Sequence, residues 1–96
     1  MKDNIIGRFA ISKAGHDKGC VYLIKASDDK YVYLSDGRFH PWNKPKRKNI
    51  KHVQMMSETA VEPLYSRLYK EDKVFDHEIK YAIKTAIRKE EGHGKE

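Results

Sequence analysis

Alternating apolar and polar positions near the start of the chain predict a first β-strand. In residues 5–13, IIGRFAISK, the large apolar side chains of Phe9 and Ile11 are separated by Arg8, Ala10 and Ser12. This period of two is typical of a strand that buries one face. We therefore expect Phe9 and Ile11 to point into a core and the residues between them to point outward.

Three further segments predict more strands. Residues 20–26, CVYLIKA, and 31–35, YVYLS, are separated by the polar turn 27–30, which predicts a hairpin. Residues 49–55 predict a short fourth strand with Ile50, Val53 and Met55 facing inward. Four strands at this spacing, with turns between them, are typical of a small barrel.

A cation-rich loop is expected between the third and fourth strands. The Asp36-Gly37 pair is a turn signal, and residues 38–48 read RFHPWNKPKRK. Pro41 and Pro45 argue against a long regular element in this stretch. We therefore expect its cations and the chain's one Trp to lie on a loop.

After about residue 57 the periodicity becomes helical. Pro63 suits the first position of one helix, and Asp76 suits the N-cap of a second helix that Gly92 would end. The apolar positions with helical spacing are Leu64, Tyr65, Leu68, Tyr69, Ile79, Ala82, Ile83, Ala86 and Ile87. The sequence thus predicts a mainly β fold, with a small barrel at 1–56 and a helical tail at 57–96, in the same domain or appended.

Composition limits the class of protein. The chain has 96 residues, enough for one domain, with 39% hydrophobic and 35% charged residues. We expect no membrane span, because the apolar runs are short, and no secretory signal, because the start of the sequence has no apolar core region. The one cysteine, Cys20, fits a cytoplasmic protein and is expected to fill space in the core.

Positive charge is concentrated in the first half of the chain. Residues 1–54 contain twelve Lys and Arg against five Asp and Glu, whereas residues 55–96 contain eight against nine. This asymmetry favours a polyanionic partner, with nucleic acid ahead of an acidic membrane. The alternative is charge that serves solubility alone.

A glycine-flanked loop carries a family resemblance. The stretch GRFAISKAGHDKGCVYLI, residues 7–24, places the polar loop KAGHDKG between two strands. This pattern resembles the KOW motif, whose central glycine is best matched by Gly19. With the Asp36-Gly37 turn and the basic stretch RKNIKH at 47–52, residues 6–54 are similar to archaeal and eukaryotic KOW ribosomal proteins of the fourteen-e type and to small bacterial KOW RNA-binding proteins. Tyr22 or a neighbour stands where KOW motifs often carry a second glycine.

The resemblance implies an SH3-like β-barrel that binds RNA, usually ribosomal RNA. In such proteins the loop between the first two strands and the basic segment are the typical contact regions. On this chain the implied contact residues are Lys13, His16, Lys18, Lys46, Arg47, Lys48, Lys51 and His52.

The chemistry of the loop adds three candidates. Lys44 extends the run of cations that would neutralise phosphates, and Arg38 would stack or hold a phosphate with its bidentate fork. Trp42 would stack on an unpaired base or, alternatively, cover the end of the barrel. Lys80, Lys84 and Arg88 share one helical face, which would widen an RNA footprint or simply be solvated.

Catalysis is not expected. The five histidines are scattered, the pair His16 and Cys20 has no partner pair at zinc spacing, and no Ser or Cys has a local base. We expect no cofactor, metal or small-molecule substrate. The leading hypothesis is a non-catalytic RNA-binding protein on or near the large ribosomal subunit, where ribosomal proteins are also possible partners. The rival is a KOW protein-interaction module of the transcription or translation machinery that uses Phe39, Trp42 and the Tyr-rich tail.

Overall fold

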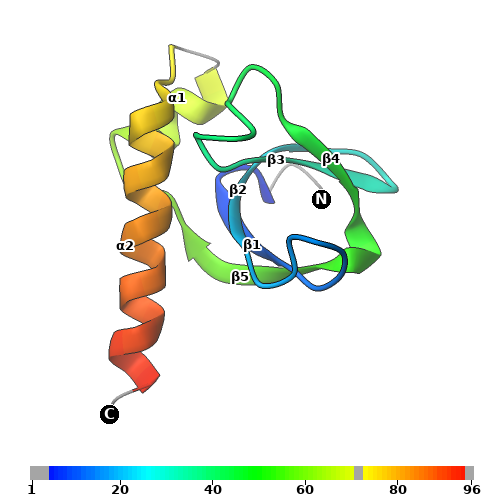
Figure 1. Cartoon of the computed structure of the whole chain (residues 1–96). Coiled ribbons are helices and arrows are strands. Elements are labelled where there is room, and N and C mark those ends of the chain that lie inside the picture. Colours follow the sequence, from blue (N-terminus) through cyan, green and yellow to red (C-terminus); the bar gives the residue numbers. More distant parts are fainter. Residues whose placement is uncertain (1–4, 71–72, 95–96) are drawn as a thin grey trace.

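The described residues form a five-stranded antiparallel sheet followed by two α-helices (Figure 1). The computed structural model describes residues 5–70 and 73–94, without the side chains of residues 69 and 89–94. The strands are β1 (Arg8–Ser12), β2 (Val21–Ser27), β3 (Tyr31–Ser35), β4 (Lys46–Asn49) and β5 (Val53–Thr59), in the order β4-β3-β2-β1-β5. A 3-10 helix, η2 (Ile50–His52), joins β4 to β5, and α1 (Leu64–Lys70) and α2 (Asp76–Gly94) follow.

The sheet curls around an apolar interior. Figure 1 shows the strands of the sheet curving round, with α2 alongside. One cluster of buried side chains lies on the concave face of the sheet. Its members are Ala10, Tyr22, Ile24, Val32, Leu34 and Val53. The strands expected at 20–26 and 31–35 are present and paired, and the mainly β fold is confirmed.

Both faces of β1 are buried, contrary to the expectation of one exposed face. Phe9 belongs to a second core cluster on the helix side of the sheet, whereas Ala10 belongs to the interior cluster. Ser12 is buried as well, and Ile11 is only partly buried. The expectation was wrong because the helices cover much of the face opposite the sheet's interior, so both faces of β1 carry buried side chains.

The expected fourth strand was misplaced. Lys46–Asn49 form β4 and pair with β3, for example Lys46 with Leu34 and Lys48 with Val32. Residues 50–52 form η2, and the last strand, β5, begins only at Val53. The cations expected on a loop therefore lie in an edge strand. Pro45 directly precedes β4, where its missing N–H costs no ladder hydrogen bond, and lysines are common on edges.

The helices pack on the sheet through the expected apolar stripes. Leu64, Leu68, Ile79, Ile83 and Ala86 share the second core cluster with Phe9 and Leu23 of the sheet. Each large side chain buried there stabilises the fold by about 1.5–3 kcal/mol. The side chain of Tyr69, also expected in the stripe, lies outside the described residues, and Ile87 is partly exposed.

Three expectations at element ends were wrong. The Asp76 carboxylate accepts a hydrogen bond from the backbone N–H of Trp42, 34 residues away in sequence, while Glu78 accepts one from the N–H of Phe75 at the start of α2. The helix runs past Gly92 to Gly94. Cys20 is exposed, because β2 begins one residue later at Val21 and leaves Cys20 on the preceding loop.

Candidate nucleic-acid interface

Glycines shape the loop that joins β1 to β2, residues 13–20, here called the 13–20 loop. Gly15 and Gly19 have φ values of 90° and 92°, which side-chain-bearing residues rarely adopt. The N–H of Gly19 donates to the carbonyl oxygen of Ser12 at 2.8 Å, so the loop closes tightly at the ends of the two strands. This closure presents Lys13, His16 and Lys18 with exposed side chains.

The 13–20 loop lies against η2 and the end of β4. The N–H of Lys13 donates to the carbonyl oxygen of His52 at 2.8 Å. The Lys48 ammonium donates to the carbonyl oxygen of Ala14 at 3.0 Å. The structure thus brings together the two segments that the sequence singled out, although more than 30 residues separate them in the chain.

η2 presents Lys51 and His52 to solvent beside this loop. Its geometry is fixed by Asn49, whose side-chain oxygen accepts a hydrogen bond from the N–H of Lys51 at 2.9 Å. Both Lys51 and His52 are exposed. Because the Lys13 backbone pairs with His52, the side chains of Lys13 and Lys51 are cations on adjoining segments.

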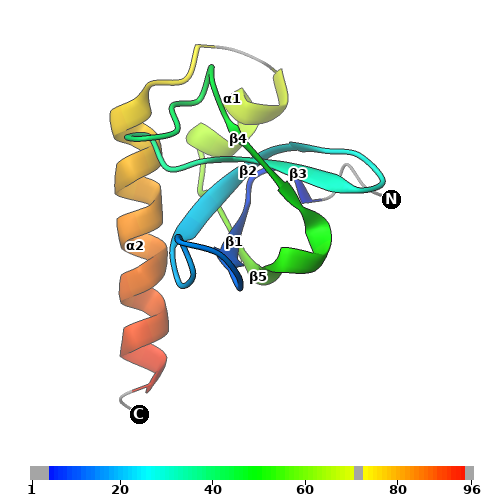
Figure 2. The same ribbon diagram turned by 45° about the vertical axis from the view of Figure 1, so that its right-hand side comes forward.

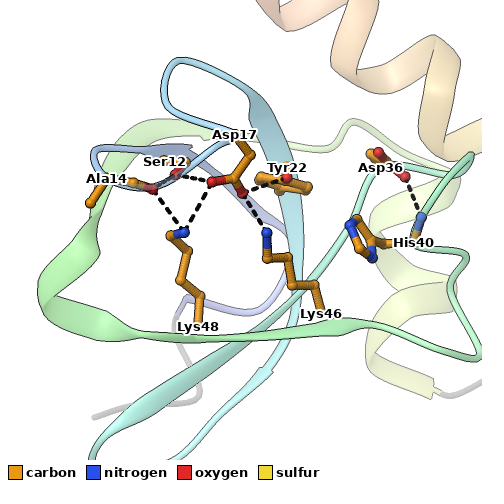
Figure 3. A network of polar contacts seen from close by, with 8 residues as sticks. All are labelled: Ser12, Ala14, Asp17, Tyr22, Asp36, His40, Lys46 and Lys48. Carbon is orange, nitrogen blue, oxygen red and sulfur yellow. Dashed lines mark hydrogen bonds and ion pairs between the residues drawn. The ribbon is translucent and has the colours of Figure 1, made fainter.

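Asp17 is the centre of a polar cluster under the loop, here called the Asp17 cluster (Figure 3). Its carboxylate accepts hydrogen bonds from Ser12 Oγ at 2.9 Å and Tyr22 Oη at 2.7 Å. It also accepts from the ammonium groups of Lys46 at 2.9 Å and Lys48 at 3.0 Å. Two of the cations that the sequence assigned to phosphate contacts are therefore already paired with a carboxylate.

Charge pairing sets the protonation of this cluster. Burial raises the pKa of Asp17, but hydrogen bonds from the two lysines and two hydroxyls outweigh it and hold the pKa well below its ordinary value. Burial and the neighbouring Asp17 carboxylate raise the pKa of Tyr22, so its hydroxyl stays protonated as a donor. The cluster carries two positive charges and one negative charge at neutral pH.

Lys46 and Lys48 differ in what they still offer a ligand. The Lys48 side chain is only 11% exposed and uses two donors, on Asp17 and on the carbonyl oxygen of Ala14. The Lys46 side chain is 30% exposed and uses one donor on Asp17. An ammonium group has three donors, so Lys46 retains capacity for a phosphate oxygen.

Arg47 lies apart from its neighbours in β4. Its guanidinium sits 4.5 Å from the ring centroid of Tyr31, whereas the side chains before and after it reach Asp17. Successive side chains of a strand point to opposite faces, which explains the separation. Arg47 is exposed and belongs to the outer face of the β3–β4 pair.

Arg38, Trp42 and Lys44 lie on the 36–45 loop, which meets the first turn of α2 rather than the 13–20 loop (Figure 2). Trp42 is partly buried against the helix-side core, with the Lys25 ammonium 5.3 Å from its ring centroid and donating to its carbonyl oxygen at 2.7 Å. Arg38 and Lys44 are exposed. These three candidates form a separate group near the helices.

Tyr22 and His40 connect the two groups. Their ring centroids are 6.1 Å apart and tilted, and the backbone N–H of His40 donates to the Asp36 carboxylate at 2.8 Å. Figure 3 shows Asp36 and His40 on the α2 side of the Asp17 cluster. No sequence pattern pointed to this cluster, except that Asp17 is the one acidic residue between Asp3 and Asp28.

The described residues offer no metal centre. Among the side chains described, those of residues 5–68, 70 and 73–88, no three from His, Cys, Asp or Glu gather to hold a metal ion. His16 and Cys20 are both exposed. The exposed side chains of Lys80, Lys84 and Arg88 lie on α2.

Neither α-helix that the structure describes is long and apolar enough to cross a membrane.

Comparisons with known proteins identify no family for this chain. A scan of the sequence against protein-family models found no matching family, and a search of curated proteins found no match.

Proposed function

We propose that this is a non-catalytic, cytoplasmic RNA-binding protein of the KOW type, which contacts ribosomal RNA on or near the large ribosomal subunit. The observation that carries the proposal is the hydrogen bond from the N–H of Lys13 to His52, which joins the 13–20 loop to η2. Two cationic segments distant in sequence thereby adjoin, on rigid backbone. Ordered cations lose less conformational entropy on binding phosphates than cations on a free tail would.

The fold supports the same proposal. The sheet curls around an apolar interior, and its two edge strands, β4 and β5, are joined by the three residues of η2. We propose that this sheet is an SH3-like barrel, with the 13–20 loop as its KOW loop. Gly19 then has the place of the motif's central glycine. Its φ of 92° explains why a glycine is needed there, because residues with a side chain rarely adopt a positive φ.

The proposed contact surface consists chiefly of cations for which the described residues provide no carboxylate partner. Lys13, Lys18 and Lys51 are exposed around the loop and η2, with His16 and His52 as further donors. Lys46 adds its remaining donors, whereas Lys48 serves mainly to hold the loop through Ala14. Phosphate oxygens are the natural acceptors for such an array.

Replacing Lys13 and Lys51 together by Ala tests the surface. With purified ribosomal RNA, affinity should fall, and the slope of log K against log salt should become shallower by about 1.5, because two phosphate contacts are lost. The measurement is filter binding at several salt concentrations. Both side chains are exposed, so folding should be unchanged.

A matched control is the replacement of Lys70 and Lys73 by Ala. Both lysines are exposed and lie where α1 ends and before α2 begins. Their replacement removes two positive charges, as the replacement of Lys13 and Lys51 does. This variant should keep the wild-type slope. Equal slopes for the two double variants would contradict the proposed surface and leave only a general charge effect.

The rival proposal is a KOW protein-interaction module. Phe39, 75% exposed on the 36–45 loop, is the observation that favours it, whereas Trp42 is partly buried in the core. Association through an apolar contact should survive nuclease and high salt. Phosphate-driven association should not.

A further inference from the structure

An apolar groove lies on the helix side of the molecule, away from the 13–20 loop. It is bounded by the end of β5, the link from β5 to α1, and α2, and its cavity volume is about 440 Å³. Buried side chains of Phe9, Ala60 and Ala86 form part of its lining. This volume falls in the range of sites that hold a ligand or a few side chains.

Large apolar side chains are exposed at the groove. Val61, on the link from β5 to α1, is 64% exposed, and Tyr81, on α2, is 71% exposed. Both residues line the groove. Along α2 the lining runs from His77 to Ala86, about 14 Å at the helical rise. An extended peptide of about four residues spans that length.

Glu58 is one of the residues that line the groove. Arg8 pairs with Thr59 and Ala10 pairs with Met55, so β5 carries extra residues opposite β1, and this irregularity includes Glu58. Bulged residues commonly redirect a side chain. The Oε1 atom of Glu58 is buried and has no hydrogen-bond partner among the described residues.

A buried carboxylate oxygen without a donor destabilises the isolated protein, because it has lost its hydration without compensation. A ligand that supplies a cationic donor would restore the hydrogen bond. Glu62, also at the groove, adds a second negative charge, and its Oε1 accepts from the N–H of Ser66. Glu78 is already paired with Arg67.

We propose that this groove binds a short segment of a partner protein, with an apolar side chain between Val61 and Tyr81 and an adjacent Lys or Arg donating to Glu58. Charge complementarity selects this occupant: the protein carries net charge +6, yet this site presents carboxylates beside apolar surface. An RNA would be repelled by those carboxylates. The inference stands independently of the RNA surface.

The test begins with a phage-displayed library of random dodecapeptides selected against the full chain. We expect selected peptides to share an apolar residue next to Lys or Arg. Synthetic copies should bind Glu58→Gln at least about ten-fold more weakly than wild type, because a charge-assisted hydrogen bond is lost. Amide NMR shifts on peptide addition should map to Val61, Tyr81 and Thr85.

Tyr81→Ala provides a second variant that should fold normally, because the side chain is exposed. It should also weaken peptide binding. The Lys13 and Lys51 double variant is the matched control and should bind peptide as wild type does, while Glu58→Gln should bind RNA as wild type does. Testing each variant with both peptide and RNA shows separately whether the groove proposal or the RNA-surface proposal is wrong.

Three outcomes would overturn the proposal. The first is the absence of any selected peptide that binds the full chain in solution. The second is equal binding by wild type, Glu58→Gln and Tyr81→Ala. The third is a dimer in sedimentation equilibrium that Glu58→Gln dissociates, because the occupant would then be a second copy of this chain.

Discussion

Asp17 holds Lys46 and Lys48, which follow it by 29 and 31 residues in the sequence. Its carboxylate lowers the positive charge of the proposed RNA surface, and its bonds to the two lysines hold β4 against the 13–20 loop. A carboxylate bonded by two ammonium groups and two hydroxyls is well satisfied although mostly buried. Asp17 is therefore a positioning residue: its negative charge offsets part of the positive charge nearby, and its bonds fix the side chains of Lys46 and Lys48.

Asp17→Asn should destabilise the fold by about 2–3 kcal/mol at neutral pH, because two partly buried ammonium groups lose their counter-ion. The pH dependence has a definite sign. The pKa of Asp17 is lower in the folded than in the unfolded state, so its stabilisation is present above the unfolded value near 3.8 and is lost as pH falls below it. Urea unfolding from pH 2 to pH 7 measures both effects.

The variant should consequently lose less stability between pH 4 and pH 2 than the wild type does. Parallel stability curves for the two proteins would show that Asp17 is not held in its charged form. No change in stability at neutral pH would show that the cluster does not hold β4.

Sequence patterns reveal little about which single residues contact one another in the fold. The cations were visible as a run, but their partner was not, because a side-chain pair across 29 residues depends on strand register. Glu58 escaped notice for a similar reason: its surroundings come from β5 and α2, which no local period connects.

Elements were predicted where one signal dominated. β2 and β3 followed from their apolar runs, and α2 from its helical stripe. β4 was missed because Lys-Arg-Lys-Asn has low strand propensity, and pairing with β3 overrides that propensity. β1 was assigned one buried face because the sequence does not show that the helices return to cover the other.

The 36–45 loop is fixed to α2 by backbone contacts that leave no room for a side chain. Gly37 has a φ of 72°, and a Cβ atom there would collide with the carbonyl oxygen of Asp76. Trp42 adds its hydrogen bond to the Asp76 carboxylate. The loop and the first turn of α2 thus form one junction.

Gly37→Ala should therefore lower the free energy of unfolding by about 2 kcal/mol or more, from strain and from displaced backbone. Gly19→Ala is the matched control: its φ is also positive, at 92°, but nothing lies within 4 Å of a Cβ there. It should cost about 1 kcal/mol. Equal costs in chemical denaturation would show that the contact with α2 contributes nothing.

At the scale of the whole molecule, two chemically different surfaces lie on a sheet with a core cluster on each face. The helix-side cluster joins Phe9 and Leu23 to Leu64, Ile79 and the rest of the helical stripe, so sheet and helices bury each other. The cationic surface at the 13–20 loop and η2 suits phosphates, whereas the groove with Glu58 suits a basic peptide.

The most direct test of the central claim is sucrose-gradient sedimentation of tagged protein in a lysate of its own cells at low salt. We expect the wild type and the Lys70 and Lys73 control to travel with the large ribosomal subunit. The Lys13 and Lys51 double variant should stay at the top of the gradient. Wild type at the top would contradict ribosome binding, and a double variant that travels with the subunit would contradict the proposed RNA surface.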